Sequence, residues 1–534
     1  MSGGNGGTGG TGGEGGRALD PRTPVVVGVG QVTNRPDPAV PADRRPQPLD
    51  LMVQAVVAAV EDCDGVAPGA AAPAGRRLLE RTGSLGVVAS FGWDPPNPGL
   101  LVAGALGIEP AEVLLSGTGG NTPQSLLHRA ARAIGRGELD VAVVTGAEAL
   151  YTRMVAARRQ HPPVRLGWAT QDPATTPAPV PFGDDRDPAT DAEVAAGVAL
   201  PVQAYPLLEN ALRAARGWTL EEHRAAIGRL WSGFSVVAAG NPYAWLPRAM
   251  AAEEIMAAGP ANRMIGFPYP KLCTANLMVD QSAAYLCCSV AAARAAGVPE
   301  DRWVFPLSGA DAVDHWYLSE RPDLHRSPAI RLAGRDALAS AGIGVDDVDR
   351  VDLYSCFPVV VQMAAAELGL ATDDADRPLT VTGGLTFGGG PGNNYTAHGI
   401  ATTVRLLRER PGSVGLVTGL GWYATKHAVG LYASRPPAHG GRDGFRWSSP
   451  QAEVDALPRC PVDDAATGPV TVETYTVTYD RDGRPDGGIA ACRTAAGART
   501  WARITDADDL GSVVAADGIG RTGTVGTDRV LKLS

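Results

Sequence analysis

The sequence predicts an α/β protein whose central part is duplicated, with an inserted loop domain and a small antiparallel β domain at the C-terminal end. Two observations predict the duplication. The segments DVAVVTG at 140–146 and SVGLVTG at 413–419 share the run Val-Thr-Gly, and each follows a helical segment that ends in a basic stretch. Asn121 and Asn394 both stand 23 residues before the valine of that run.

The first half has the order strand, helix, strand, helix, strand. It begins with the buried-type run PVVVGVGQ at 24–31, continues through an amphipathic helix at 49–63, and reaches a strand at 85–90. A strand at 112–116 then leads to Asn121-Thr122-Pro123. Asparagine or threonine as N-cap with proline in the first turn predicts a helix that runs to about residue 137.

The second half repeats this order. It begins with VFPLSGADA at 304, continues through a helix at 327–341, and reaches a strand at 351–357. The stretch LTVTGGLTFGGGPGNNYTAH at 379–398 predicts a short strand, a glycine-rich loop and the start of a helix at 399–410. Such a loop can point amide groups at an anion or oxyanion, helped by the helix dipole behind it. A tight structural turn is the alternative interpretation.

Composition limits the possible functions. Of the 534 residues, 44% are hydrophobic and 19% charged, as in a globular protein with more than one core. The net charge of −10, without a basic run, argues against nucleic acid or an anionic membrane as a partner. No apolar run reaches the roughly 18 residues of a membrane span. Seven cysteines, an odd number, predict reduced thiols in the cytoplasm, and no histidine or cysteine spacing predicts a metal site.

Changes in composition and periodicity predict the domain boundaries. The run VTVETYTVTY at 470–479 alternates with period two, and short strands follow it, which predicts a small OB-like barrel. We expect a disordered Gly-rich tail at 1–22, a first α/β half at 23–150, a loop domain at 151–300, a second half at 301–435, a linker at 436–465 and the β-barrel domain at 466–534.

The order of glycine loops along the duplicated chain resembles the thiolase superfamily over roughly 24–435, in particular the sterol-carrier-protein-type thiolases and their thiolase-like relatives. The resemblance implies a layered α/β/α/β/α fold. It also implies a ligand or substrate that is a coenzyme A thioester, with no other bound cofactor, and a possible homodimer. The loop domain helps to bind CoA in that family, so Arg153, Arg158 and Arg159 are candidates for phosphate contacts. A solvated basic patch is the alternative interpretation.

Four loops carry thiolase chemistry, and this sequence departs from three of them. The nucleophilic cysteine at a helix N-terminus is replaced by Asn121, whose amide cannot form a thioester. The His-Asp-Cys-Phe loop reads Tyr354-Ser355-Cys356-Phe357, so its histidine is lost and its cysteine is kept. The Gly-His-Pro loop reads Gly389-Gly390-Pro391, without the histidine, whereas Gly419-Leu420-Gly421 agrees with the Gly-x-Gly loop.

These departures leave three hypotheses. The first is an acetyl-CoA-acetyltransferase-like protein of lipid or sterol metabolism with an altered mechanism, the second a non-catalytic acyl-CoA-binding or scaffold protein, and the third an aldolase acting on a CoA-linked side chain. In a catalytic protein, Tyr354 and Cys356 would exchange a proton. Candidate site residues also include Asn121, His398 and the oxyanion glycines Gly388, Gly389, Gly390, Gly419 and Gly421. A packed core thiol, a buried ring, a structural histidine and a helix cap are the alternative interpretations of Cys356, Tyr354, His398 and Asn121.

Overall fold

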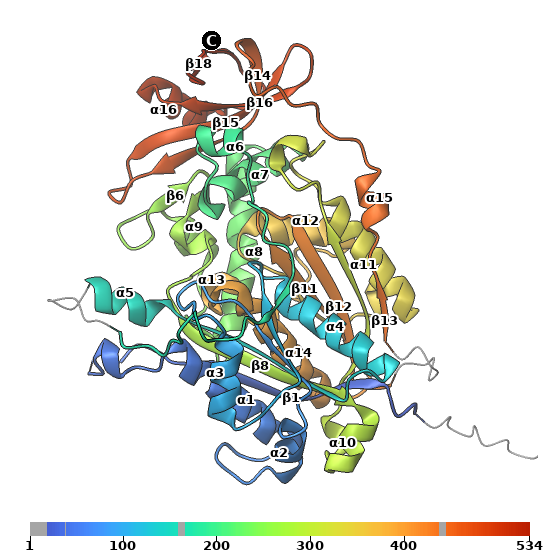
Figure 1. The fold of residues 1–534 in the computed structure, drawn as a ribbon. Helices are drawn as coiled ribbons and strands as arrows, with labels where there is room; N and C mark the ends of the chain where they lie inside the picture. Colours follow the sequence, from blue (N-terminus) through green and yellow to red (C-terminus); the bar gives the residue numbers. More distant parts are fainter. Residues whose placement is uncertain (1–18, 38, 159–165, 437–444) are drawn as a thin grey trace, which may run out of the picture.

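A computed structural model describes residues 19–37, 39–158, 166–436 and 445–534 (Figure 1). Most of the tail that we predicted to be disordered, residues 1–18, lies outside the described residues, as does 437–444 of the predicted linker. The described strands form three sheets, two in the duplicated part and one in the C-terminal part. None of the helices within the described ranges is long and apolar enough to cross a membrane.

The first sheet belongs to the first half of the duplication. Its strand order is β1 (Pro24–Thr33), β8 (Asp280–Ser289), β4 (Val141–Ala149), β2 (Ser84–Val87), β3 (Glu112–Ser116) and β5 (Val180–Phe182). Strand β8 pairs antiparallel with β1 and β4 and is buried along its whole length. It is therefore an interior strand of this sheet, although its residues fall within the range that we assigned to the loop domain.

The second sheet repeats the first. Its order is β10 (Arg350–Asp352), β11 (Val414–Gly421), β12 (Lys426–Ala433), β9 (Phe305–Val313) and β13 (Arg446–Ser448). The series β1-β8-β4-β2 corresponds to β9-β12-β11-β10, with the same parallel and antiparallel pairings. This correspondence confirms the predicted duplication. Strand β13, from the predicted linker, pairs parallel with β9 and extends the sheet.

Two helices, α4 (Thr122–Arg136) and α14 (Tyr395–Glu409), lie between the two sheets. Leu126 and Leu127 of α4 and Ile400 of α14 belong to one buried cluster with Val144 of the first sheet and Tyr432 of the second. Because both helices bury side chains on two sides, they form the central layer of the fold.

The outer helices complete a layered α/β/α/β/α arrangement. They are α1 (Pro48–Asp64), α2 (Pro73–Leu79), α3 (Pro98–Leu106) and α10 (Val290–Ala296) beside the first sheet, and α11 (Pro328–Ala341) and α12 (Pro358–Leu368) beside the second. The amphipathic helix predicted at 49–63 is α1, and its neighbours shield the face of the sheet that α4 and α14 leave open. The predicted layered fold is therefore confirmed.

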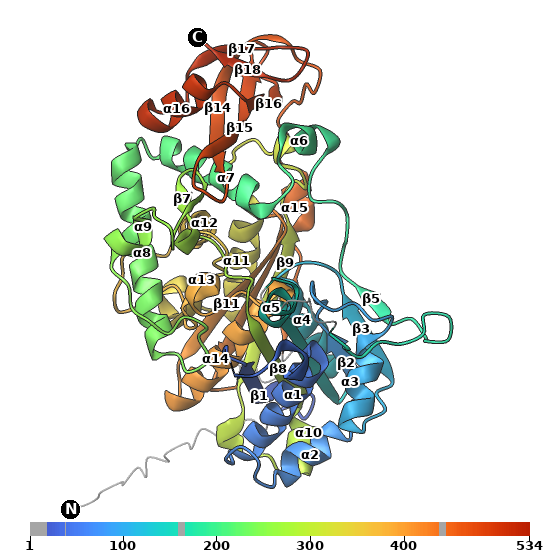
Figure 2. The same cartoon turned by 90° about the vertical axis from the view of Figure 1, so that its left-hand side faces the viewer.

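Helices α7 (Pro201–Ala215), α8 (Leu220–Gly240) and α9 (Ala252–Met256) of the predicted loop domain run along one side of the second half (Figure 2). Helix α5 (Leu150–Arg158) lies against the first half, and α6 (Asp191–Ala196) contacts the C-terminal sheet. The same segment also supplies β6 (Met264–Gly266), which pairs with β14 (Gly468–Tyr479) of the C-terminal sheet. The loop segment thus contacts both the second half and the C-terminal sheet.

The C-terminal sheet has the order β16 (Arg499–Ile504), β15 (Pro485–Thr494), β14 (Gly468–Tyr479), β17 (Thr522–Val525) and β18 (Leu531–Leu533), and α16 (Ala507–Ala516) packs beside it. A single bridge between Arg503 and Val530 joins the two ends of the sheet. A barrel closed along its whole length stays a prediction.

Arg499 of β16 fastens the C-terminal sheet to the second half. Its guanidinium is fully buried and donates to the carbonyl oxygens of Leu318 at 2.8 Å and Arg321 at 2.6 Å. It also donates to both carboxylate oxygens of Glu473 at 2.7 Å. Such a charge-assisted cluster fixes the sheet in one orientation.

The strand predicted before the glycine loop is wrong, and the one predicted at 351–357 ends at Asp352. Leu353 donates its amide to Leu379 O at 2.9 Å, but no ladder continues from there. Instead the Asp352 carboxylate accepts the Val381 amide at 3.0 Å and the Thr380 hydroxyl at 2.9 Å. Residues 380–381 are therefore held by the Asp352 side chain and not by a neighbouring strand, and the chain turns there.

Candidate functional site

The first, second and fourth loops of the thiolase resemblance meet at the start of α4. A Cβ atom added at Gly419 would lie 2.7 Å from Asn121 Cα, and one added at Gly421 would lie 2.6 Å from Asn121 Oδ1. The ring of Tyr354 presses against Gly120 from the other side, so closely that a side chain there would collide with it. At Gly419 the backbone of Asn121 leaves no room for a Cβ atom, and at Gly421 and Gly120 the side chains of Asn121 and Tyr354 occupy that space.

The third loop lies elsewhere. The carbonyl of Gly388 accepts Gln281 Nε2 at 2.9 Å, and a Cβ atom at Gly389 would clash with the same glutamine. The amide of Gly388 donates to Gly384 O at 2.7 Å and that of Gly390 to Asn276 O at 3.0 Å. Because these two amides are already bonded to carbonyls, they are not available to an oxyanion in this structure.

Cys356 and Tyr354 are buried and neutral. Tyr205 from α7 lies beside Cys356; its hydroxyl donates to Trp422 O at 2.5 Å, and its ring stacks on Phe357 with centroids 4.5 Å apart. Burial raises the pKa of Cys356 to about 12. Burial also raises the pKa of Tyr354 well above its ordinary value. Neither group therefore carries a charge near neutral pH.

The remaining predicted residues lie apart from this cluster. His398 Nδ1 is 2.9 Å from Gln31 Oε1 of β1, and burial lowers the pKa of His398 to about 3, so the ring is neutral. Arg153 donates to Gly92 O at 3.0 Å, and Arg158 is exposed at the end of α5. Arg159 lies outside the described residues. A role of these arginines in CoA binding stays a prediction.

The two asparagines that mark the duplication have different surroundings. Asn394 is buried, and its Nδ2 donates to Gly146 O at 2.6 Å and Ala283 O at 3.3 Å in the first sheet. Asn121 is half-buried and borders a cavity, and its Oδ1 has no hydrogen-bond partner within the described part of the chain. Asn394 Oδ1 also lacks a partner among the described residues, so the difference is that Asn121 lines this cavity and Asn394 does not.

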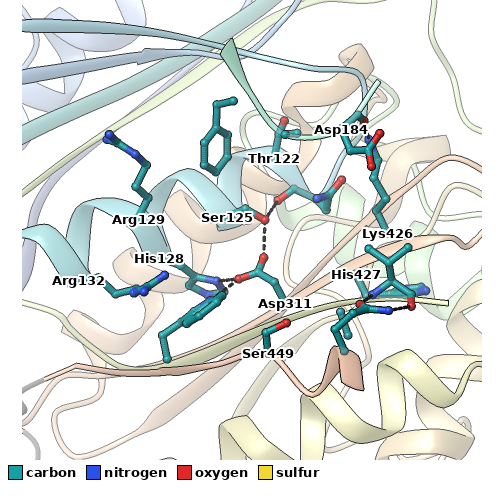
Figure 3. A pocket seen from close by; sticks show the side chains of 17 residues that line it. Thr122, Ser125, His128, Arg129, Arg132, Asp184, Asp311, Lys426, His427 and Ser449 are labelled. Atoms are coloured by element: carbon teal, nitrogen blue, oxygen red, sulfur yellow. Dashed lines mark hydrogen bonds and ion pairs between the residues drawn. The ribbon is translucent and has the colours of Figure 1, made fainter. Parts of the chain in front are cut away.

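The cavity has a volume of about 490 Å3 and lies between α4 and the second sheet (Figure 3). One wall is the face of α4 that carries Ser125, His128 and Arg132. The opposite wall is formed by β9 and β12, with Asp311 and Lys426. Gly183, Asp184, Trp447, Ser449 and Gln451 also line it. The predicted linker thus helps to enclose the cavity.

Asp311 is the centre of hydrogen bonding in this cavity. Its carboxylate accepts the Ser125 hydroxyl at 2.5 Å and the Trp447 indole at 2.6 Å, and lies 2.7 Å from His128 Nδ1. Burial alone would raise the pKa of Asp311, but His128 and these donors outweigh it and hold the pKa below its usual value. Since the serine bonds to the carboxylate and not to the histidine, the three residues do not form a nucleophilic triad.

Three cations surround the cavity. Arg129 makes two hydrogen bonds of 2.8 Å to Glu112, and the Arg132 guanidinium lies 3.9 Å from the ring centroid of Trp447. Lys426 Nζ donates to Asp184 O at 2.7 Å and to Thr118 O. Sequence reasoning missed these residues. The spacing of Arg129 and Arg132, three positions apart on a helix, was the signal that they share a face.

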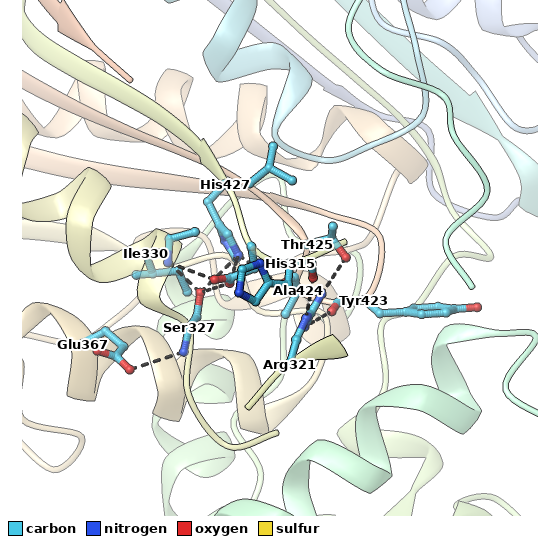
Figure 4. Close-up of polar contacts among 12 residues, drawn as sticks. His315, Arg321, Ser327, Ile330, Glu367, Tyr423, Ala424, Thr425 and His427 are labelled. Carbon is cyan, nitrogen blue, oxygen red and sulfur yellow. Dashed lines mark hydrogen bonds and ion pairs between the residues drawn. The ribbon is translucent and has the colours of Figure 1, made fainter. Parts of the chain in front are cut away.

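The turn before Lys426 is strained and tightly held (Figure 4). Trp422 and Ala424 have φ values of 55° and 52°, which are unfavourable for residues other than glycine. Arg321 donates to Tyr423 O at 2.8 Å and to Thr425 Oγ1 at 2.9 Å. These bonds fix the backbone from which Lys426 reaches the cavity.

Comparison with known proteins agrees with the fold. The families described as "Thiolase C-terminal domain-like" and "Thiolase-like protein type 1 additional C-terminal domain" match residues 310–432 and 450–530. The crystal structure of a monomeric SCP2-thiolase like protein type 1 from Mycobacterium smegmatis superposes with a TM-score of 0.80 at 35% identity, over 97% of this chain and 100% of that one. The layered fold and the order of the four loops thus define a protein of the thiolase superfamily. The chain belongs to the SCP2-thiolase-like proteins of type 1.

More distant relatives share less. An acetyl-CoA acetyltransferase from Methanothermobacter thermautotrophicus is 27% identical over 192 residues, which are 33% of this chain and about half, 47%, of that protein. The Ltp2-ChsH2(DUF35) aldolase has a TM-score of 0.55 at 21% identity, over 78% of this chain and 100% of that one. The dimeric peroxisomal thiolase of Saccharomyces cerevisiae has a TM-score of 0.53 at 12% identity, over 78% and 99%. The last two show the fold alone.

Proposed function

We propose that this protein binds an acyl-CoA thioester and does not form an acyl-cysteine on it. The main support is the state of the loops that carry thiolase chemistry. Asn121 stands at the position of the nucleophile, and Cys356, the one cysteine in these loops, is a buried thiol whose pKa is raised to about 12. Attack on a thioester requires a thiolate, which neither position supplies near neutral pH.

We place the ligand in the cavity beside α4. The chain has a net charge of −10, yet Arg129 and Arg132 line this cavity. The phosphates of coenzyme A are attracted by these cations, and its pantetheine amides can donate to the unpaired Oδ1 of Asn121. Arg153 and Arg158 of α5 remain candidates for outer phosphate contacts.

We also propose that the protein acts as a monomer in the cytoplasm, in lipid or sterol metabolism. Strand β5 pairs with β3 through Leu114 and Val180 and is the edge strand of the first sheet; with three residues, it offers a second chain little to pair with. The crystal structure of the relative from Mycobacterium smegmatis is described as monomeric. We therefore propose a monomer in place of the possible homodimer that the family resemblance implied.

Thermal unfolding with CoA, acetyl-CoA and acetoacetyl-CoA tests the proposal. A thioester present at 100 times its Kd should stabilise the fold by about 2.7 kcal/mol. Arg132→Ala should weaken binding about tenfold, because a charge-assisted phosphate contact is lost. Arg136→Ala is the matched control, since Arg136 is exposed on the last turn of the same helix and does not line the cavity.

Three results would count against the proposal. If none of the three compounds stabilises the protein, CoA thioesters are excluded as ligands. CoA-dependent cleavage of acetoacetyl-CoA that is abolished by Cys356→Ala would show that an acyl-cysteine forms after all. An equal loss of affinity in the Arg132 and Arg136 variants would place the ligand outside the cavity.

A further inference from the structure

Lysine is rare in this chain, and one lysine is buried. The 47 basic residues include three lysines, namely Lys271, Lys426 and Lys532. Lys271 and Lys532 are exposed, whereas Lys426 is 4% exposed. Arginine and lysine both donate hydrogen bonds to carbonyls, but only the lysine amine can lose its proton and become a nucleophile. A buried lysine in a chain that uses mostly arginine therefore suggests a role for a neutral, nucleophilic amine at this position.

The hydrogen bonds of Lys426 suit a neutral amine. Its Nζ donates to the carbonyl oxygens of Thr118 and Asp184, and no carboxylate forms a salt bridge with it among the residues described. A neutral amine has two N–H donors and one lone pair. When both donors are engaged by these carbonyls, the lone pair is left for a group in the cavity that Lys426 lines.

Burial favours loss of the proton from Lys426. The pKa of Lys426 is lowered to about 8, mainly by burial and to a smaller extent by Arg186, whereas Asp185 and Asp184 act in the opposite direction. The rings of Trp316 and Trp422, with centroids 5.9 and 5.7 Å from Nζ, also favour the cation. At pH 8 about half of these amines are neutral, against roughly 0.4% for an ordinary exposed lysine.

Asn121 completes the site. Gly421 lies against both side chains, because a Cβ atom there would be 2.6 Å from Asn121 Oδ1 and 2.9 Å from Lys426 Cε. The Oδ1 atom accepts no hydrogen bond within the described ranges. An amine and an unpaired acceptor thus share one corner of the cavity, where the hydroxyl formed when an amine adds to a carbonyl can donate to the amide oxygen.

We propose that Lys426 forms a Schiff base with the ketone of a 3-oxoacyl thioester. The lone pair of Nζ forms the new bond to the ketone carbon, and the carbonyl oxygen takes up a proton as Nζ releases one. Loss of water then gives the imine, so that amine and ketone yield imine and water. A protonated imine withdraws electrons from the adjacent carbon, which permits carbon–carbon bond cleavage or formation without a cysteine.

Reductive trapping tests this inference on the full chain. Acetoacetyl-CoA and sodium cyanoborohydride should add one ligand per chain, less the ketone oxygen that leaves as water, located by peptide mapping on Lys426. Lys426→Arg should abolish the adduct, and Lys271→Arg should keep it. Competitive labelling of the wild-type protein with acetic anhydride needs no variant, and the Lys426 reaction should titrate with a midpoint near pH 8.

The identity of the ligand rests on the proposed function, and the two can fail separately. Stabilisation by acetoacetyl-CoA without an adduct would overturn the Schiff base and keep CoA-thioester binding. Ethyl acetoacetate carries the ketone without CoA, so an adduct with this ester alone would keep the Schiff base and refute the CoA ligand. Labelling spread over all three lysines, or a Lys426 that acetic anhydride does not reach at pH 9, would overturn the inference.

Discussion

Replacement of Arg499 by methionine should loosen the C-terminal sheet from the rest of the molecule. The buried guanidinium makes short hydrogen bonds to the carbonyls of Leu318 and Arg321 and to both oxygens of Glu473. Removing one partner of a buried ion pair costs about 3–5 kcal/mol, because the other polar groups stay buried without a partner. Glu473 keeps its bond to Arg493 at 2.6 Å, so we expect the lower end of this range.

Urea unfolding followed by tryptophan fluorescence measures the effect, because Trp501 is buried beside Arg499 and donates to Ser319 Oγ at 2.9 Å. Arg503→Met is the matched control. Arg503 lies on the same strand, is exposed, and makes a side-chain hydrogen bond of 3.2 Å to Asp528 O. A loss below about 1 kcal/mol for Arg499→Met, or an equal loss for both variants, would refute the role of this arginine.

The pH dependence gives a second measurement of the same contact. Burial alone would raise the pKa of Glu473, but Arg499 and Arg493 outweigh it and hold the pKa below its usual value. A carboxylate whose pKa is lowered by folding stabilises the fold above its unfolded pKa of about 4.3, and this contribution is lost as the pH falls further. The difference in stability between wild type and Arg499→Met should therefore shrink below about pH 4.

Two further predictions follow from the site and the sheet edge. Iodoacetamide at pH 8 should leave Cys356 unmodified in the native protein, because a thiol of pKa about 12 is roughly 0.01% ionised at that pH. Rapid alkylation of Cys356, mapped by mass spectrometry, would contradict this. The Cys356→Ala variant should be stabilised by acetyl-CoA as much as the wild type. Light scattering during size exclusion should give a mass near 55 kDa at every concentration, whereas a mass twice as large would show that the short edge strand β5 does not prevent dimerisation.

Much of the framework was predictable because it depends on local patterns. The predicted strand at 112–116 is β3, and the helix expected after Asn121 is α4, since proline at its start and glycine at its end are local signals. Strand β8 was not assigned to the first sheet, because a short apolar run does not reveal its partners, which lie more than 100 residues away.

The site was harder to predict than the framework. The resemblance identified Asn121 and the loop glycines beside it, which the fold does bring together. It gave no indication that Tyr205 of the loop segment would cover Cys356, or that Asp311 and Lys426 would face α4. These contacts join segments far apart in the chain, so they depend on the packing of whole sheets and have no local signal.

The unequal surroundings of Asn121 and Asn394 have a consequence for stoichiometry. A chain built from two similar halves has, in principle, two equivalent helix starts at which a ligand can be held. In this protein the second helix start is sealed against the first sheet by the hydrogen bonds of Asn394, and the first opens onto the cavity. The two halves therefore share a framework, but of the two helix starts only that of α4 borders the cavity. Each chain should bind one ligand, although the duplication provides two equivalent positions.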